Sequence, residues 1–173
     1  YVLSEYNSAG VATRRQVGEV KSKGVEIEAA MALSDSFRLS AAYSYINARI
    51  TKSPNAWEED SRTPMQPDET ASVWLDYTQQ TGMFKNLGLG LGLRYVGQSS
   101  YSTLNNNTIA FVTGETVAEL DSESYTFMDA SLRYQIQNIG LALHVTNLFD
   151  KEYDTSCTEQ LCYFGEGRRV MLT

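Results

Sequence analysis

The sequence predicts an all-β protein, namely an antiparallel up-and-down transmembrane β-barrel of which this chain supplies about eight strand segments, an incomplete set. Three observations predict this class. Apolar and small or polar residues alternate with a two-residue period through most of the 173 residues. The connections between the alternating segments are short and long in turn. The acidic residues gather in the long connections.

Residues 87–95 show the alternation most clearly, because four leucines and a tyrosine alternate there with three glycines and an arginine. Successive side chains of a strand point to opposite faces, so one face of this segment is apolar and the other carries almost no side chains. A helical period fits none of the alternating segments as well. In chain order, the predicted strand segments are 1–6, 17–33, 37–50, 69–80, 87–102, 125–136, 139–153 and 167–173.

The remaining segments follow the same pattern. Valine, isoleucine, leucine, methionine and tyrosine occupy one parity, and alanine, serine, glycine and occasional charged residues occupy the other. The apolar faces are Val25, Ile27, Ala29, Met31 and Leu33; Phe37, Leu39, Ala41, Tyr43 and Tyr45; Val73, Leu75 and Tyr77; Met128, Ala130, Leu132 and Tyr134; and Ile139, Leu141, Leu143 and Val145.

The connections alternate in length along the chain. The short ones contain Asp, Gly and Asn, as hairpin turns do. Because alternate turns of an up-and-down sheet lie at the same end, all short turns fall on one rim and all long loops on the other. Transmembrane barrels have this asymmetry, with short periplasmic turns and longer extracellular loops. The short turns are 34–36, 82–86 and 137–138, and the long loops are 51–68, 103–124 and 154–166.

Charge follows the same division. The stretches 51–69, 103–124 and 154–167 carry net charges of −3, −4 and −3, against −7 for the whole chain. The acidity therefore belongs to one rim. This balance argues against a nucleic-acid surface, which needs a basic stripe. The single histidine excludes a multi-histidine metal site, and no catalytic constellation is present, so no enzyme is predicted.

A soluble antiparallel sandwich or a lipocalin-like barrel also alternates. Three features favour the membrane barrel over both. The second face is rich in Gly, Ala and Ser, where a water-facing sheet carries Lys, Glu and Thr. Several strands exceed the about 9 to 11 residues that a tilted crossing needs. Tyrosines lie on the apolar faces near strand ends, as in aromatic girdles.

Several segments resemble the TonB-dependent outer-membrane receptors. These are residues 22–50, 63–77, 88–102 and 125–136, and above all "LALHVTNLFDKEY" at 141–153. The run Asn147–Tyr153 is similar to the motif that precedes the last loop of these receptors. Within the family, the siderophore receptors of the ferrichrome or hydroxamate type are the most similar subgroup, and they often carry a cysteine pair in that loop.

The resemblance implies a barrel of about 22 strands with an N-terminal plug in its lumen. Residues 1–173 are then expected to be the C-terminal part of the barrel, without the plug and without the last few residues. The implied function is outer-membrane uptake of a ferric siderophore, driven by TonB through the plug, in contact with outer-membrane lipid. The alternatives are uptake of another substrate, such as cobalamin or a carbohydrate, or a small complete barrel.

Cys157 and Cys162 favour a disulfide in an oxidising compartment, because metal binding needs further Cys or His nearby and a redox pair usually has Cys-x-x-Cys spacing. No cofactor is expected. Aromatic residues in or beside the long loops are candidates for packing on the siderophore, which itself holds the iron. They are Trp57, Tyr101, Phe111, Tyr163 and Phe164.

Overall fold

The computed structural model describes residues 2–6, 12–16, 18–54, 58–100, 121–157 and 162–173, and the side chains of 18–54, 58–100, 121–155 and 162–173 among them. Eleven strands are present in these residues, and the described part of the chain holds no helix long and apolar enough to cross a membrane. The strands are β1 (Val2–Tyr6), β2 (Ala12–Gln16), β3 (Glu19–Ala32), β4 (Phe37–Lys52), β5 (Glu69–Thr78), β6 (Leu87–Val96), β7 (Tyr125–Ile136), β8 (Ile139–Thr146), β9 (Asp154–Cys157), β10 (Cys162–Phe164) and β11 (Arg169–Leu172).

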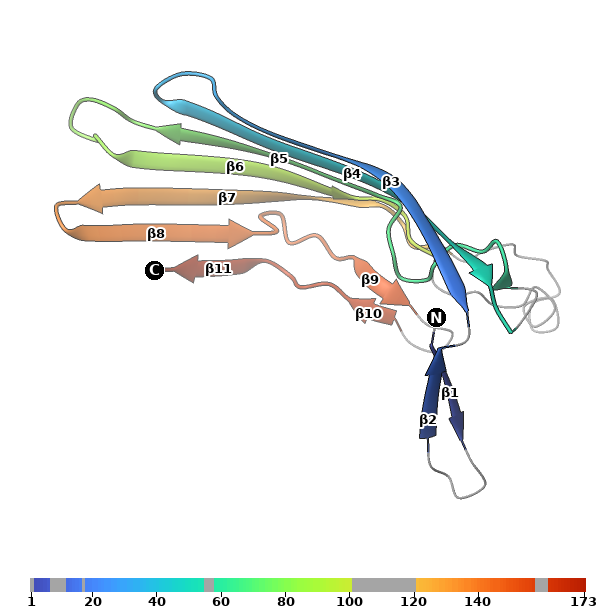
Figure 1. The fold of residues 1–173 in the computed structure, drawn as a ribbon. Helices are drawn as coiled ribbons and strands as arrows, with labels where there is room; N and C mark the ends of the chain where they lie inside the picture. The colour runs from blue at the N-terminus through green and yellow to red at the C-terminus, as the bar shows by residue number, and fades with distance from the viewer. Residues whose placement is uncertain (1, 7–11, 17, 55–57, 101–120, 158–161) are drawn as a thin grey trace.

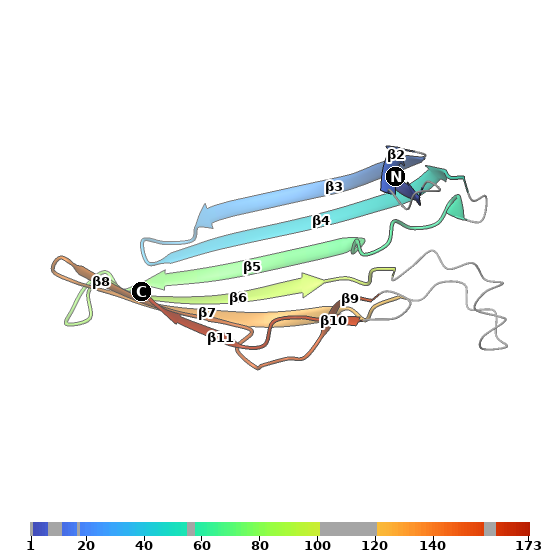
Figure 2. The same cartoon turned by 90° about the horizontal axis from the view of Figure 1, so that it is seen from below.

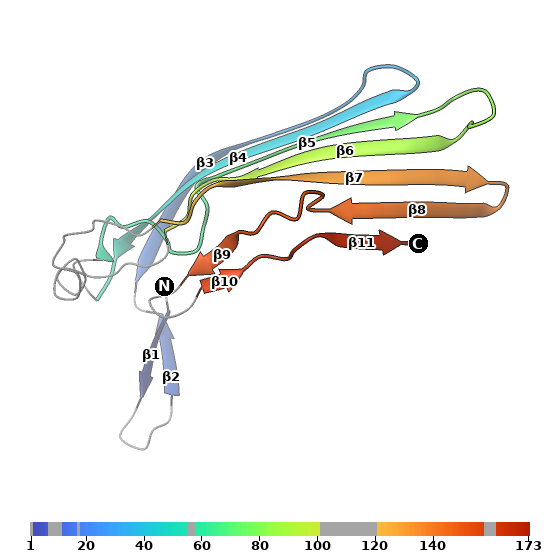
Figure 3. The ribbon, with the colours of Figure 1, turned by 180° about the vertical axis from the view of Figure 1, so that it is seen from behind.

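Seven strands form one curved antiparallel sheet in the order β11-β8-β7-β6-β5-β4-β3. From β3 to β8, each strand pairs with the strand that follows it in the sequence, so the topology is up-and-down, as predicted. The three short turns, β3–β4, β5–β6 and β7–β8, lie at one end of the sheet, and the long connections leave from the other end (Figures 1 and 3). The rim assignment from connection length is therefore confirmed.

The two faces of this sheet differ in polarity. The cross-strand register aligns the predicted apolar residues into one face, and many of them are exposed, such as Ile27, Val73, Leu91 and Leu132. The buried apolar residues of the described chain are few: Ala48, Ile50 and Phe127. An apolar surface of this extent is expected to face hydrocarbon, because monomeric soluble proteins rarely expose one. We refer to it as the lipid face and to the opposite side as the polar face.

Each edge of the sheet remains open in the described residues. β3 pairs with β4 alone and β11 with β8 alone, and the two edge strands do not pair with each other. The view from below shows the sheet as an open, curved wall (Figure 2). A small complete barrel needs these edges joined, and a sandwich needs a second sheet over the apolar face. The structure shows neither arrangement in the part of the chain that it describes.

Several predicted boundaries were wrong. Within the predicted segment 1–6, Val2–Tyr6 forms a separate hairpin with β2, and the strands predicted at 87–102 and 139–153 end at Val96 and Thr146. The run Asn147–Tyr153 is therefore not a strand. Asn147 and Asp150 have φ values of 52° and 55°, in the left-handed region that breaks an extended chain. The last loop then forms a hairpin of its own, β9–β10, which the sequence analysis did not predict.

Candidate functional site

Trp74 covers the centre of the polar face. A Cβ atom placed on Gly90 would lie 2.5 Å from Trp74 Cζ2, and one placed on Gly92 would lie 2.6 Å from Trp74 Cζ3. Both distances are too short for a real contact, so the indole ring lies directly on the backbone of β6. The alternating glycines of "GLGLGL" therefore leave room for an aromatic side chain from the neighbouring strand β5.

Two ion pairs flank this tryptophan on the polar face. Arg133 of β7 reaches Asp76 of β5, with Nη2 at 2.5 Å from Oδ1. Its path crosses β6 beside Gly88, whose position opposite Arg133 carries no side chain. The second pair joins adjacent strands, with Arg94 Nε 2.6 Å from Asp129 Oδ2. Arg133 and Arg94 are thus neutralised by carboxylates on other strands of the same face.

Asp129 also holds the start of the last loop. Its Oδ1 accepts a hydrogen bond of 2.9 Å from the backbone N–H of Asn147, and both residues are buried. The Asn147 side chain donates to the carbonyl oxygens of Lys151 and Glu166, at 2.9 and 3.3 Å, and accepts from the Lys151 N–H at 2.8 Å. These bonds join the outgoing and returning segments at the base of the loop.

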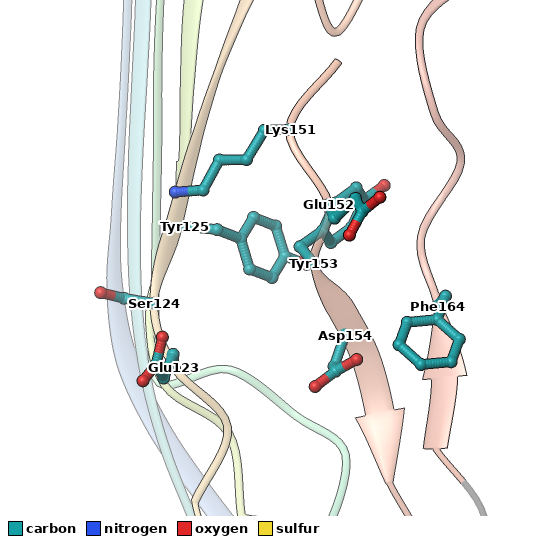
Figure 4. A pocket seen from close by; sticks show the side chains of 8 residues that line it. All are labelled: Glu123, Ser124, Tyr125, Lys151, Glu152, Tyr153, Asp154 and Phe164. Carbon is teal, nitrogen blue, oxygen red and sulfur yellow. The ribbon is translucent and has the colours of Figure 1, made fainter. Parts of the chain in front are cut away.

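An aromatic cluster lies above this base. The ring centroids of Tyr125 and Tyr153 are 4.5 Å apart, as are those of Phe127 and Tyr153, and the Arg94 guanidinium carbon lies 5.2 Å from the Phe127 ring centroid. A cavity of about 240 Å³ opens beside the cluster. Figure 4 shows Tyr125 projecting from the sheet toward Tyr153, with Phe164 on the next strand. The residues that line this cavity are Glu123, Ser124, Tyr125, Lys151, Glu152, Tyr153, Asp154 and Phe164.

Arg62 joins two long connections at the rim. Its Nη1 lies 3.2 Å from Asp68 Oδ2, and its Nη2 lies 2.5 Å from Asp121 Oδ2. Nearby, the Ser99 N–H donates to the Ser122 hydroxyl at 2.9 Å, and both serines are buried. Ion pairs and hydrogen bonds therefore join three segments at this rim: the one after β4, the one after β6 and the one before β7. The ordered structure thus continues beyond the regular strands of the sheet.

Replacing Arg62 with alanine is expected to loosen this rim, because the change leaves two carboxylates, Asp68 and Asp121, without their shared cation. The cost is about 1 to 2 kcal/mol, since the guanidinium is mostly buried while its partners are partly exposed. Hydrogen exchange at the Ser99 and Ser122 amides measures the effect. Arg62→Lys is the control, and equal exchange rates in Arg62→Ala and the unmodified protein would contradict the prediction.

Glu19 and Lys52 form an exposed ion pair where β3 and β4 extend past the apolar band, with Lys52 Nζ 2.7 Å from Glu19 Oε2. The hydrogen bond and the charge of Lys52 lower the pKa of the Glu19 carboxyl, and the same contact raises the pKa of the Lys52 ammonium. Because both groups are in water, the pair contributes little to stability. The Glu19 carboxylate thus neutralises the charge of the Lys52 ammonium.

The predicted site residues have different outcomes. Tyr163 and Phe164 lie on β10 and are 54% and 78% exposed, but only Phe164 lines the cavity. Trp57, Tyr101 and Phe111 lie outside the described residues. The register of β9 and β10 places Cys157 opposite Cys162, and no free cysteine occurs among the described residues. The described part of the chain also has no group of three His, Cys, Asp or Glu side chains arranged to hold a metal ion.

The structure adds residues that the sequence analysis did not select. They are Trp74, Asp76, Arg94, Tyr125, Phe127, Asp129, Arg133 and Tyr153. The two-residue alternation of the strands already distinguished some of these residues. Trp74, Asp76, Asp129 and Arg133 occupy the polar positions of their strands, where a large aromatic or a charge contrasts with the surrounding Gly, Ala and Ser. Which of them meet depends on the register between strands, which alternation alone does not give.

Comparison with known proteins agrees with this architecture. The family described as TonB dependent receptor-like, beta-barrel matches residues 2–148. The chain is 37% identical to the ferrioxamine B receptor of Salmonella typhimurium over 95% of its length and 23% of that protein. It is 40% identical to the ferrichrome outer membrane transporter/phage receptor of Escherichia coli K12 over 90% of its length and 20% of that protein. The chain thus spans less than a quarter of these relatives.

Solved structures show the same fold. The ferric-catecholate import receptor Fiu from Escherichia coli K12 superposes with a TM-score of 0.67, at 26% identity, over 98% of this chain and 22% of that one. The ferric yersiniabactin uptake receptor FyuA from Yersinia pestis gives a TM-score of 0.72 at 21% identity, over 91% of this chain and 23% of that one. The seven-stranded sheet therefore corresponds to part of a larger barrel wall.

Proposed function

Because this chain belongs to the TonB-dependent receptor-like β-barrel family of the bacterial outer membrane, we propose that it forms wall and extracellular rim of a transporter for ferric siderophores, energised through TonB. The proposal makes the protein a transport receptor and not an enzyme. The observation that carries it is the 37–40% identity, over at least nine-tenths of the chain, to receptors for ferrioxamine B and ferrichrome. That the residues are the C-terminal part of the barrel stays a prediction.

The polar face suits the wall of a lumen through which a solute passes. Two of its arginines are paired with carboxylates, Arg133 with Asp76 and Arg94 with Asp129, so these four charged groups neutralise one another within the wall. Trp74 lies flat on β6 and presents a smooth surface. Every strand of the sheet contributes exposed apolar side chains to the opposite face, as contact with lipid requires.

Iron uptake tests this proposal in a strain that expresses the complete receptor and lacks its other siderophore receptors. We expect growth under iron starvation with ferrioxamine B or ferrichrome as the iron source, and loss of that growth when TonB is deleted. Ferric enterobactin, a catecholate, is the comparison ligand. Growth with none of the siderophores, together with TonB-dependent uptake of cobalamin or a carbohydrate, would assign the receptor to another substrate.

The long-loop rim is the proposed region of first ligand contact. The cavity at the base of the last loop offers three aromatic rings, Tyr125, Tyr153 and Phe164, beside carboxylates and one lysine. Aromatic side chains give a large contact area at a small entropic cost. The exposed Phe164 and Tyr163 are the rings that a ligand above the loop would meet first.

We expect Phe164→Ala to weaken siderophore binding by the complete receptor about three- to tenfold, the range that an aromatic contact gives. Tyr163→Ala tests the neighbouring ring, which does not line the cavity. Binding is measured by quenching of intrinsic fluorescence on titration with the ferric siderophore. Unchanged affinity in either variant removes that residue from the proposed contact surface.

We propose that a disulfide bond between Cys157 and Cys162 closes the tip of the last loop. The directly opposed positions of the two residues in the β9–β10 ladder support this pairing. A bridge closing a loop of this size stabilises it by about 2 kcal/mol in the chain-entropy account. We therefore expect the Cys157→Ser/Cys162→Ser variant to keep its barrel but to be cut faster by protease in this loop. Mass spectrometry without reductant provides the check on the bond itself, and two alkylatable thiols in the native protein would refute the pairing.

A further inference from the structure

The cavity at the base of the last loop has an excess of negative charge in its lining. Three carboxylates and one ammonium group line it, from Glu123, Glu152, Asp154 and Lys151. None of these four groups takes part in an ion pair within the part of the chain that the structure describes. With three acids against one lysine, the lining therefore has a net charge of −2.

The charges are unevenly distributed over the cavity. Figure 4 shows the Lys151 ammonium group directed toward the sheet, at the opposite end of the cavity from Asp154 and Phe164. Glu123, which precedes β7, lies at the same end as Asp154 of β9. Carboxylates from two segments distant in the sequence therefore face one end of the cavity, and the one lysine of its lining is at the other end.

The aromatic part of the lining is held in place by packing. The Tyr153 ring centroid lies 4.5 Å from those of Tyr125 and Phe127. The Tyr153 ring also covers the backbone of Gly165, because a Cβ atom placed on this glycine would overlap it. Phe164, the residue before that glycine, completes the aromatic lining on β10. A ligand thus meets rings that are already ordered, so little conformational entropy is lost when it binds.

The size of the cavity indicates that a substituent enters it, and not a whole ferric siderophore. Its volume is about 240 Å³, whereas sites that enclose a drug-sized ligand measure about 300 to 1,000 Å³. Carboxylates attract an ammonium group, and the faces of aromatic rings attract the same group through their quadrupole. The long-loop stretches 51–69, 103–124 and 154–167 carry a net charge of −10 in total, which also favours the approach of a cation.

We propose that the end of this cavity formed by Glu123 and Asp154 binds an alkylammonium arm of the siderophore. The receptor then selects ferric siderophores with a free amine over neutral ones that hold iron in the same way. This inference rests on the proposed transport function and adds the charge of the substrate to it. The iron complex stays outside the cavity, and its amine arm enters beside Phe164, which is 78% exposed.

Two ferric siderophores that differ only in this charge test the site. Ferrioxamine B has a free primary amine, and N-acetylferrioxamine B has a neutral amide at the same place on the same iron complex. We expect the complete receptor to bind the amine about fivefold more tightly at low ionic strength, the upper range of a partly exposed ion pair. Higher salt should reduce the difference. Both affinities are measured by quenching of intrinsic fluorescence.

Substitutions identify the groups responsible for the preference. Glu123→Gln/Asp154→Asn should bring the affinity ratio of the two siderophores close to one, since no carboxylate then faces the amine. Lys151→Gln should raise the ratio, because it removes the only cation of the lining. Glu166→Gln is the control and should keep the ratio. It removes an acid of the same loop that does not line the cavity and whose side chain is 77% exposed.

Equal binding of the two siderophores by the unmodified receptor overturns the proposal. A preference that persists in Glu123→Gln/Asp154→Asn, or that Glu166→Gln loses to the same extent, also overturns it. TonB-dependent uptake of both siderophores is measured in parallel. If both are taken up and bind equally, only the ammonium site is wrong, whereas if neither is bound or taken up, the transport function is wrong as well.

Discussion

Replacing Asp129 with alanine is expected to destabilise the last loop and the β7–β8 end of the sheet by about 3 kcal/mol. Two losses combine. The Asp129 side chain is only 10% exposed while that of Arg94 is 50% exposed, so breaking their pair costs less than for a fully buried one. The buried N–H of Asn147 also loses its acceptor, which costs about 1 to 3 kcal/mol.

Thermal unfolding of the complete receptor and protease sensitivity of residues 147–168 measure this effect. Asp129→Asn keeps an oxygen that accepts from Asn147 N–H, so it should lose only the charge contribution. Asp76→Ala is the matched control, because it breaks the other ion pair of the polar face, with Arg133, without contacting the last loop. Equal loop sensitivity in Asp129→Ala and Asp76→Ala would show that Asp129 does not hold the loop.

Gly92→Val is expected to cost up to about 3 kcal/mol, because the new side chain occupies the space of the Trp74 ring. A β-branched residue has little freedom to turn away, and the indole ring would have to leave the surface of β6. Gly88→Val is the matched control on the same strand and face. The closest atom that its Cβ would meet is Arg133 Nε at 3.1 Å, on a flexible side chain.

A double-mutant cycle with Trp74→Ala identifies the cause of the Gly92→Val loss. With the indole removed, the valine has room, so the cost of Gly92→Val should fall to less than half. Thermal unfolding midpoints of the four proteins give the coupling energy, and Trp74 fluorescence reports whether the ring has moved in Gly92→Val alone. Additive effects of the two changes would mean that the glycine is needed for some reason other than the tryptophan.

The strands of the sheet were predictable because a two-residue alternation is a local property of the chain. β3, β5, β6, β7 and β8 all begin within two residues of the predicted starts. Their ends were less predictable, since Val96 and Thr146 are followed by residues whose composition still permits a strand. At Asn147, the left-handed backbone is stabilised by hydrogen bonds to Lys151 and Glu166, and Glu166 is distant in sequence.

The candidate site divides in the same way. The position of Phe164 in the last loop followed from the sequence, and the structure places it at a cavity. Tyr125 and Tyr153 line the cavity together with Phe164. They are 28 residues apart in the sequence, and their rings meet only because the last loop folds back against β7.

The sequence by itself determined the strand class, the apolar and polar faces, the division into a short-turn rim and a long-loop rim, and the resemblance to the receptor family. These follow from residue order, since parity and turn composition act over a few residues. The tertiary structure decided the open seven-stranded wall, the Arg133–Asp76 and Arg94–Asp129 pairs, and the packing of Trp74 on the glycines of β6. Those contacts depend on strand register and on the curvature of the sheet, which arise only when distant segments pair.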